Sequence, residues 1–200
     1  MDGVLFDSEA VAVQSLMYQY PGMTKEMQKE VLTGNFHEEI AKITILKIEE
    51  TEEEKSDRQR KYAEDKAKSP MYDGIKELLT NLHKDGYTIA MNTSALDRNC
   101  IPLIEGAGIT NFFDFIATAE LSRSKVEKFK IIKNKYGVEE SNMLFVTDTL
   151  GDIREADLAG VPTVAVTWGA HDRSYFSREP HDNLIGIVDT VSELEAFIKK

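Results

Sequence analysis

The sequence predicts an α/β protein with a doubly wound parallel sheet and a small α-helical domain inserted near its beginning. Two observations favour this fold. From residue 70 onward, short apolar runs alternate with stretches whose pattern is helical. Between residues 10 and 69, the pattern is helical throughout, with no convincing strand. Strands that are separated by helices of this length pair in parallel, because the chain must cross over between them.

The expected strands are short and apolar on both faces, as strands covered by helices on each side should be. They span residues 87–91, 115–118, 143–147 and 163–167, with 185–188 as a further candidate. The expected helices span residues 75–84, 96–107, 126–136, 153–159 and 191–199. Glycine follows several of these helices, at Gly86, Gly108, Gly137 and Gly160, which is where glycine commonly ends a helix.

Four further helices are expected in the inserted domain. They span residues 11–20, 24–32, 37–50 and 52–68. The last has mixed charges at helical spacing, which is typical of a solvated face. We therefore divide the chain into a core of residues 1–9 and 70–200 and a helical domain of residues 10–69. Residues 34–37 permit two interpretations, a plain turn between helices or a loop that contacts substrate.

The composition excludes some classes of partner. The chain has 35 acidic and 24 basic residues, a net charge of −11, which argues against binding to nucleic acid. A small anionic substrate remains compatible, because a metal or a few lysines can reverse the charge of a site. Cys100 is the only cysteine, which favours a reducing cytoplasm. No apolar run approaches the ~20 residues of a membrane span, and nothing indicates the oligomeric state.

Polar residues follow the apolar runs where strands are expected to end. Thr93 and Ser94 follow one strand, and Asp148 and Asp152 follow another. Ligands of a parallel α/β sheet bind beyond the carboxyl ends of its strands, so these residues are candidates for a site. Two carboxylates four residues apart across a strand-to-helix turn can face one point and suit Mg²⁺. The scattered histidines and the single cysteine do not indicate zinc.

Each candidate also has a structural interpretation. Asp152 could cap the helix that follows it, and Ser94 could form a capping box with Asp97. Lys125 begins a lysine-rich stretch that could be a solvated helix face. Asp2 lies near the start of the chain, where disorder is common. No role is assigned to the four histidines.

In order along the chain, these residues resemble the four motifs of the haloacid dehalogenase superfamily. Residues 1–9, Met-Asp-Gly-Val-Leu-Phe-Asp-Ser-Glu, resemble a first motif in which an apolar strand leads into Asp-Met-Asp-Gly-Val-Leu-Phe-Asp-Ser-Glu. Thr93 corresponds to the second motif, Lys125 to the third, and Asp148 with Asp152 to the fourth. The resemblance covers nearly the whole chain and implies a Rossmann-like core with a helical cap, as in the phosphoglycolate phosphatase and β-phosphoglucomutase-like members.

The resemblance implies a Mg²⁺-dependent phosphatase that acts through a phosphoaspartate on a small phosphorylated metabolite. Asp2 would be the general acid and base, which favours phosphoryl chemistry over dehalogenation. Thr93 would donate a hydrogen bond to the phosphoryl group, with Ser94 as a further substrate contact and the alternative donor. Lys125 would neutralise charge, with Lys128 as the alternative. The metal ligands would be three groups: the carboxylates of Asp148 and Asp152 and the main-chain carbonyl of Asp2.

The sequence departs from the family pattern at the nucleophile. That aspartate would stand one residue ahead of Met1, and its strand further upstream. Losing about four buried apolar side chains at ~1.5–3 kcal/mol each would remove ~6–12 kcal/mol, unless another segment fills the gap. We expect the natural enzyme to begin some residues earlier, so that Met1 of this chain is an internal methionine at which the start has been assigned. The chain as written is then expected to be weak or inactive. The alternatives are a silent relative that binds a phosphorylated ligand or a protein partner, and a phosphomutase.

Overall fold

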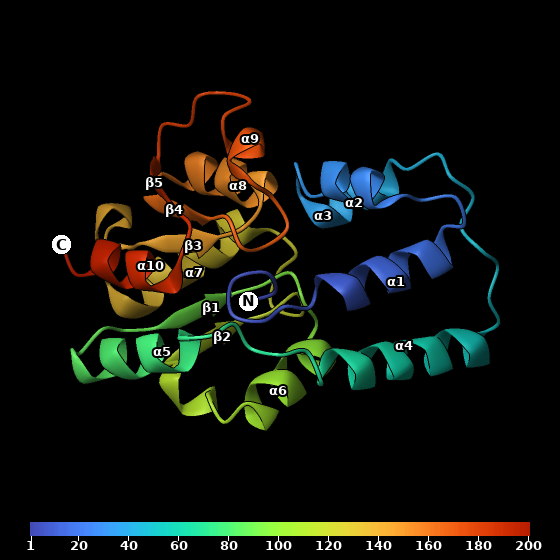
Figure 1. Cartoon of the computed structure of the whole chain (residues 1–200), viewed down its shortest axis with the longest axis horizontal. Helices are drawn as coiled ribbons and strands as arrows, with labels where there is room; N and C mark the ends of the chain where they lie inside the picture. Colours follow the sequence, from blue (N-terminus) through green and yellow to red (C-terminus); the bar gives the residue numbers. More distant parts are fainter.

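The structure is a computed structural model that describes residues 1–200, and it confirms the predicted α/β class (Figure 1). The strands are β1 (Ala90–Asn92), β2 (Phe115–Ala117), β3 (Phe145–Thr147), β4 (Thr163–Val166) and β5 (Leu184–Val188). The helices among them are α5 (Ile75–Lys84), α6 (Asp97–Gly106), α7 (Lys125–Tyr136), α8 (Leu150–Ala159), α9 (Arg173–Phe176) and α10 (Val191–Ile198). Two short 3₁₀ helices, η1 (Thr110–Phe112) and η2 (Glu140–Asn142), complete this part.

All strand pairs are parallel, but they form two separate ladders. One ladder has the order β1-β2 and the other has the order β3-β4-β5. In the first, Met91 lies opposite Ile116, and in the second, Val146 lies opposite Val164. One edge of β1 and one edge of β3 therefore have no strand partner.

The first six residues form a tight turn instead of a strand. The main-chain carbonyl of Met1 accepts hydrogen bonds from the N–H groups of Val4, Leu5 and Phe6. Val4 and Phe6 are buried in the main hydrophobic cluster together with Ile75. In Figure 1 the turn lies beside the end of β1. The turn thus contributes buried apolar side chains to the core, although it adds no strand to either ladder.

Helices cover both faces of the longer ladder, as a doubly wound sheet requires. Alternate side chains of β4 point to opposite faces because a strand has a period of two residues. Val164 and Val166 belong to the cluster that includes α5, α6 and α10. Ala165 belongs to a cluster with Ile153 of α8 and Phe176 of α9. The burial of all four β4 residues confirms the prediction of a strand that is apolar on both sides.

The residues between the two parts of the core form four helices, which lie to one side of the α/β region (Figure 1). They are α1 (Glu9–Gln19), α2 (Lys25–Val31), α3 (Phe36–Ala41) and α4 (Glu52–Lys66). Helices α1 and α4 contact one another, and α4 also contacts α6 of the core. No helix of the protein is long and apolar enough to cross a membrane.

Three predicted elements differ from the structure by three or more residues at one end, and one of them is the helix expected over 153–159, which begins at Leu150. The helix expected over 37–50 ends at Ala41, and the N–H of Ile48 instead donates to the carbonyl of Gln19 at 2.9 Å. This contact leads the chain back along α1 in an irregular conformation. The strand expected from Tyr87 begins only at Ala90, because the N–H of Ile89 donates to the Asp114 carboxylate and not to a neighbouring strand.

Candidate active site

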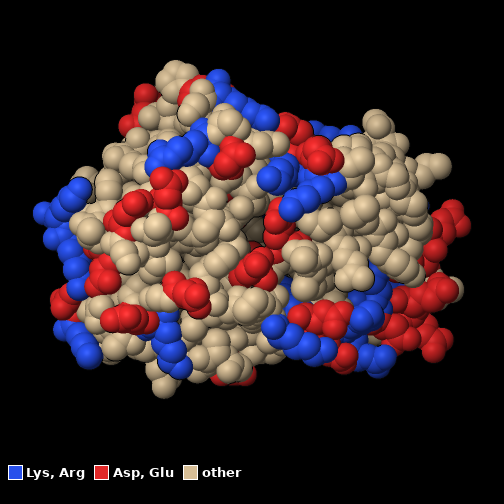
Figure 2. All heavy atoms as spheres, viewed as in Figure 1, with Lys and Arg blue, Asp and Glu red and all other residues tan.

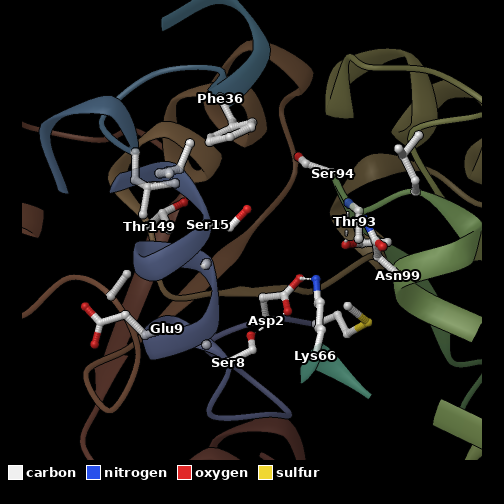
Figure 3. A pocket seen from close by; sticks show the side chains of 18 of the residues that line it. Asp2, Ser8, Glu9, Ser15, Phe36, Lys66, Thr93, Ser94, Asn99 and Thr149 are labelled. Carbon is white, nitrogen blue, oxygen red and sulfur yellow. Dashed lines mark hydrogen bonds and ion pairs between the residues drawn. The ribbon is translucent and has the colours of Figure 1, made fainter. Parts of the chain in front are cut away.

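A pocket of about 430 Å³ lies between the helical domain and the carboxyl ends of the strands. Figure 2 shows it as a hollow with basic and acidic side chains at its rim, and Figure 3 shows side chains that line it. All six residues predicted for the site line this pocket: Asp2, Thr93, Ser94, Lys125, Asp148 and Asp152. The structure therefore brings together residues from four separate segments of the chain.

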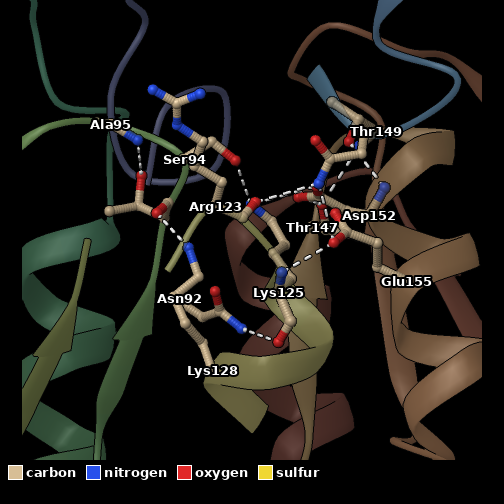
Figure 4. A network of polar contacts seen from close by, with 12 residues as sticks. Asn92, Ser94, Ala95, Arg123, Lys125, Lys128, Thr147, Thr149, Asp152 and Glu155 are labelled. Carbon is tan, nitrogen blue, oxygen red and sulfur yellow. Dashed lines mark hydrogen bonds and ion pairs between the residues drawn. The ribbon is translucent and has the colours of Figure 1, made fainter. Parts of the chain in front are cut away.

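Lys125 links two of these segments (Figure 4). Its Nζ donates to Ser94 Oγ at 2.9 Å and lies 3.3 Å from Asp152 Oδ1. The other oxygen of Asp152 accepts a hydrogen bond from Thr147 Oγ1 at 2.7 Å. Lys125 is buried, so the interpretation of a solvated face was wrong for this residue. Ser124 caps α7 and thereby places Lys125 in the first turn, next to the ends of the strands.

The capping interpretations of Ser94 and Asp152 were also wrong. Helix α6 begins after Leu96, which makes no side-chain capping bond, and Asp97 Oδ1 instead accepts from Thr118 Oγ1. Helix α8 is capped by Thr149, whose side chain accepts from the N–H of Asp152. The side chains of Ser94 and Asp152 are therefore left for the contacts with Lys125.

Thr93 and Lys128 are distinguished by where they point. Thr93 Oγ1 accepts from the N–H of Ala95 at 3.1 Å, which leaves its O–H proton free to be donated into the pocket. Lys128 is fully buried outside the pocket lining, and its Nζ donates to the Thr93 carbonyl at 2.6 Å. Lys125, and not the alternative Lys128, is the lysine that the pocket contains.

Burial lowers the pKa of Lys128 from 10.5 to about 7, and the nearby Lys125 adds to this effect. Below pH 7 Lys128 is charged in both states, and the folded state bears the full cost of burying that charge. Between pH 7 and 10.5 the folded state is neutral at Lys128 while the unfolded chain is still protonated, so the cost falls as the pH rises. Above pH 10.5 both states are neutral and the cost disappears. We expect Lys128→Met to stabilise the fold by roughly 2–4 kcal/mol at pH 6.5, allowing for the lost hydrogen bond, and by less than about 1 kcal/mol at pH 10.

Urea denaturation of the Lys128→Met variant at the two pH values would measure this difference. Lys130→Met is the control, because Lys130 lies on the same helix but is exposed and pairs only with Glu127. An equal gain in stability at pH 6.5 and pH 10 would show that the buried charge is not the cause.

Asp148 lies in a tight cradle made by two glycines. Its Oδ2 accepts from the N–H of Ala170 at 2.9 Å. A Cβ atom placed on Gly3 or on Gly169 would approach Asp148 Oδ2 to 1.8 or 2.5 Å, so neither position can hold a side chain. Burial raises the pKa of Asp148 to about 6. The N–H of Ala170 and the positively charged Met1 amino group oppose this rise without cancelling it.

The residues present fit a magnesium ion. The protein contains no group of three or more His, Cys, Asp or Glu side chains arranged to hold a metal ion. Magnesium, however, commonly takes only one or two carboxylates, with water and substrate oxygens as its other ligands. Asp148 and Asp152 supply two carboxylates, and the buried negative charge of Asp148 is one that a bound cation would offset.

The carboxylate of Asp2 is ordered by the two segments that join the core to the helical domain. Its Oδ1 accepts from Ser8 Oγ at 2.5 Å, and its Oδ2 lies 2.8 Å from the Nζ of Lys66, which is buried (Figure 3). Burial is the largest single influence and would raise the pKa of Asp2, but the Lys66 ammonium, the Met1 amino group and the hydrogen bonds from Lys66 and Ser8 together lower it. Asp2 is therefore ordered, and the expectation of disorder was wrong. Its two partners connect it to the helical domain, because Ser8 directly precedes α1 and Lys66 is the last residue of α4.

Several contacts between the helical domain and the core were not predicted. Asn35 caps α3, and its Nδ2 also donates to Glu155 Oε1 and to the Arg123 carbonyl, at 3.1 Å each. His171, fully buried, accepts at Nδ1 from the N–H of Leu150 and contacts the carbonyl of Lys29 through Nε2. Gly34 and Asn35 are therefore a turn between α2 and α3 that also docks on the core, and Phe36 and His37 begin α3.

The comparison with known proteins agrees with this geometry. The family model of the haloacid dehalogenase-like hydrolases matches residues 1–166. The chain belongs to this family. The match includes all four segments that line the candidate site, and it confirms the resemblance seen in the sequence.

Individual relatives in the family are phosphatases by name. A phosphoglycolate phosphatase of Pseudomonas syringae pv. tomato is 31% identical over 147 residues, which are 70% of this chain and 54% of the relative. Another phosphoglycolate phosphatase, of Mesorhizobium japonicum, is 32% identical over 56% of this chain and 51% of the relative. This chain spans about half the length of the curated relatives it matches.

A solved structure has the same fold. The structure of CbbY from Rhodobacter sphaeroides in complex with phosphate superposes with a TM-score of 0.76 at 18% identity, covering 97% of this chain and 93% of CbbY. The similarity therefore extends over the helical domain as well as over the α/β core.

Proposed function

We propose that the pocket is the phosphoryl-binding site of a Mg²⁺-dependent phosphatase for a small phosphate monoester. The observation that carries the proposal is the convergence of Thr93, Lys125, Asp148 and Asp152 on one pocket. Hydrogen-bond donors, a buried cation and paired carboxylates at one place are what transfer of a dianionic phosphoryl group requires. The family of the chain and the names of its relatives support the same class of reaction.

Each residue has a distinct role in this proposal. Thr93 donates its free O–H to a phosphoryl oxygen, and Ser94 lies beside it as a further contact. Lys125 balances the negative charge of the phosphoryl group from its position between Ser94 and Asp152. Asp2, as general acid and base, would give a proton to the leaving oxygen and later remove one from water; because the Lys66 ion pair keeps it ionised in the free protein, it would first take up a proton when the ester binds.

The metal would be held by the carboxylates of Asp148 and Asp152 and by the main-chain carbonyl of Asp2. When bound, Mg²⁺ supplies positive charge that offsets the charge of the phosphoryl oxygens. The two carboxylates are held in place by hydrogen bonds from the protein itself. The N–H of Ala170 donates to Asp148, and the O–H of Thr147 donates to Asp152.

The nucleophile of the proposed reaction is an aspartate directly ahead of Met1, a position that the 200 residues do not include. The chain as written is then expected to bind a phosphate ester without consuming it. A phosphomutase is the second candidate within the same site. It would release an isomer in place of free phosphate, so an assay of both products separates the two reactions.

Calorimetric titration of the 200-residue chain with inorganic phosphate, with and without Mg²⁺, tests the proposal. We expect binding that requires Mg²⁺ and that weakens about tenfold or more in Lys125→Met, because a buried cation at the phosphoryl group is lost. Lys130→Met is the matched control on the same helix. Equal binding without Mg²⁺, or unchanged binding in Lys125→Met, would contradict the proposal.

A further inference from the structure

Glu155 is a buried acidic residue of α8 that does not line the pocket. Its Oε1 accepts two hydrogen bonds, one from the main-chain N–H of Lys125 at 2.8 Å and one from Asn35 Nδ2 at 3.1 Å (Figure 4). Lys125 is the lysine of the proposed phosphoryl site, and Asn35 belongs to the helical domain. A single carboxylate oxygen therefore joins the two.

Helix α8 holds Lys125 both at its side chain and at its main chain. Asp152 and Glu155 are three residues apart, so they project from the same face of the helix. Asp152 lies 3.3 Å from the ammonium of Lys125, and Glu155 accepts from its N–H. That N–H belongs to the first residue of α7 and has no partner within the helix. Glu155 thus fixes the point from which the Lys125 side chain extends to Ser94.

Two further hydrogen bonds hold the main chain around Lys125. Asn92 Nδ2 of β1 donates to the Lys125 carbonyl at 3.2 Å, and Asn35 Nδ2 donates to the Arg123 carbonyl at 3.1 Å. Of the three main-chain contacts, the one to Arg123 comes from the helical domain, and the one to Glu155 is shared with it. The start of α7 is therefore placed by the helical domain as well as by the core.

Asn35 reaches Glu155 only while α2 and α3 are docked on the core. Asn35 caps α3 through Oδ1, which leaves Nδ2 to donate toward the core. The residues before it pack tightly on α8: the N–H of Gly151 donates to the Leu32 carbonyl at 3.0 Å, and a Cβ placed on Gly151 would approach the Gly34 carbonyl oxygen to 2.1 Å. Separation of this turn from α8 would break the bond from Asn35 to Glu155.

The burial of the Glu155 carboxylate costs free energy. Burial raises the pKa of Glu155, although the N–H and the charge of Lys125 oppose the rise. A buried charge with a partner is weak evidence of stabilisation, because an apolar side chain of similar size is often no less stable. The contacts of Glu155 therefore indicate a role in placing Lys125 more than a role in holding the fold together.

We propose that Glu155 is a positioning residue for Lys125, and that its bond to Asn35 makes the position of the Lys125 ammonium depend on the docking of α2 and α3. The proposal rests on the proposed function, because it takes Lys125 to bind the phosphoryl group. Glu155 does not touch that group itself. A phosphoryl group at Lys125 and a docked helical domain favour the same arrangement of α7, so each strengthens the other.

Calorimetric titration of the 200-residue chain with inorganic phosphate in the presence of Mg²⁺ tests the positioning role. Glu155→Met removes the acceptor at similar size and is expected to weaken phosphate binding about tenfold. Glu155→Gln keeps an oxygen acceptor and is expected to restore most of the affinity. Glu127→Met is the control, because it removes a carboxylate from the first turn of the same helix, where Glu127 is exposed and pairs only with Lys130.

A second variant tests the connection to the helical domain. Asn35→Ser keeps a side-chain oxygen that can cap α3 but removes the amide donor. We expect it to weaken phosphate binding about fivefold in the parent chain and less than about twofold in the Glu155→Met background, since residues that act through one contact are not additive. An equal loss in both backgrounds would show that Asn35 and Glu155 act separately and would overturn the connection.

Hydrogen exchange of residues 29–41 supplies a measurement that a purely structural role would not change. Because binding and docking strengthen each other by the same factor, phosphate with Mg²⁺ is expected to slow this exchange about fivefold or more in the parent chain. In Glu155→Met saturated with phosphate, we expect no slowing. Slowing that persists in this variant would show that Glu155 only supports the fold. If Glu155→Met does not fold, the same comparison on Asn35→Ser decides the question.

The outcomes separate the two proposals. Undiminished phosphate binding in Glu155→Met, an equal loss in Glu127→Met, or a Glu155→Gln variant as weak as Glu155→Met would overturn the positioning role of Glu155. Each of these results would leave the phosphatase proposal standing. A failure of the parent chain to bind phosphate in the presence of Mg²⁺ would overturn the proposed function and this inference with it.

Discussion

An apolar strand that ends in Phe-Asp, joined directly ahead of Met1, is expected to raise the Mg²⁺-dependent hydrolysis of p-nitrophenyl phosphate by at least about 10⁴-fold over the 200-residue chain. The reason is chemical: the added aspartate stands where the family's motif has its nucleophile, and the loss of a covalent nucleophile costs factors of this size. Stopped assays of free phosphate on both proteins would measure the difference.

The matched control is the same extension ending in Phe-Asn. This control restores the packing of the strand without the nucleophile. Both extensions are expected to stabilise the fold by several kcal/mol, because the added strand can pair its main chain with a free strand edge of β1 or β3 and bury its apolar side chains. Comparable activity in the 200-residue chain, or in the Phe-Asn form, would show that hydrolysis uses another group.

Asp148→Asn is expected to weaken the Mg²⁺-dependent binding of phosphate by about 100-fold, since a metal ligand lost from a closed site is worth several kcal/mol. The fold should survive, because the amide oxygen can still accept from the N–H of Ala170. In the absence of Mg²⁺, the variant is expected to be more stable than the parent at pH 7.5, since it removes a buried charge whose desolvation is offset only in part by the N–H of Ala170 and the Met1 amino group.

These two opposite effects distinguish a metal ligand from a residue that only supports the fold. Thermal unfolding with and without Mg²⁺, together with calorimetry, would measure both. Asp182→Asn is the control, because Asp182 is exposed and lies outside the pocket. A variant that is destabilised without Mg²⁺ and still binds phosphate would contradict the assignment of Asp148.

The local pattern of the sequence was sufficient for the fold class and for much of the site. Buried strands of apolar residues and helices with caps and glycine stops are encoded by neighbouring residues, so the bounds of α5 and the existence of β4 were predicted correctly. The carboxyl ends of parallel strands meet at one edge. For that reason Thr93, Asp148 and Asp152 could be expected in one site before any contact was known, whereas Lys125 was expected there only through the resemblance to the family.

Where the prediction failed, distant residues decided the conformation. Ile48 leaves the helical pattern because it bonds to Gln19, and Tyr87 lies outside β1 because Asp114 takes the N–H of Ile89. The local sequence of each segment is compatible with the element that was expected. The competing hydrogen bond comes from a part of the chain that no local pattern includes.

The sequence by itself determined the class of fold, the order of the motifs and the residue types at the strand ends. Only the tertiary structure decided that Lys66 holds Asp2 and that Asn35 docks on Glu155. Lys66 and Asp2 are 64 residues apart, and Asn35 and Glu155 are 120 apart. Such pairs form because folding lays the helical domain over the strand ends, and neither partner has a sequence pattern that specifies the other.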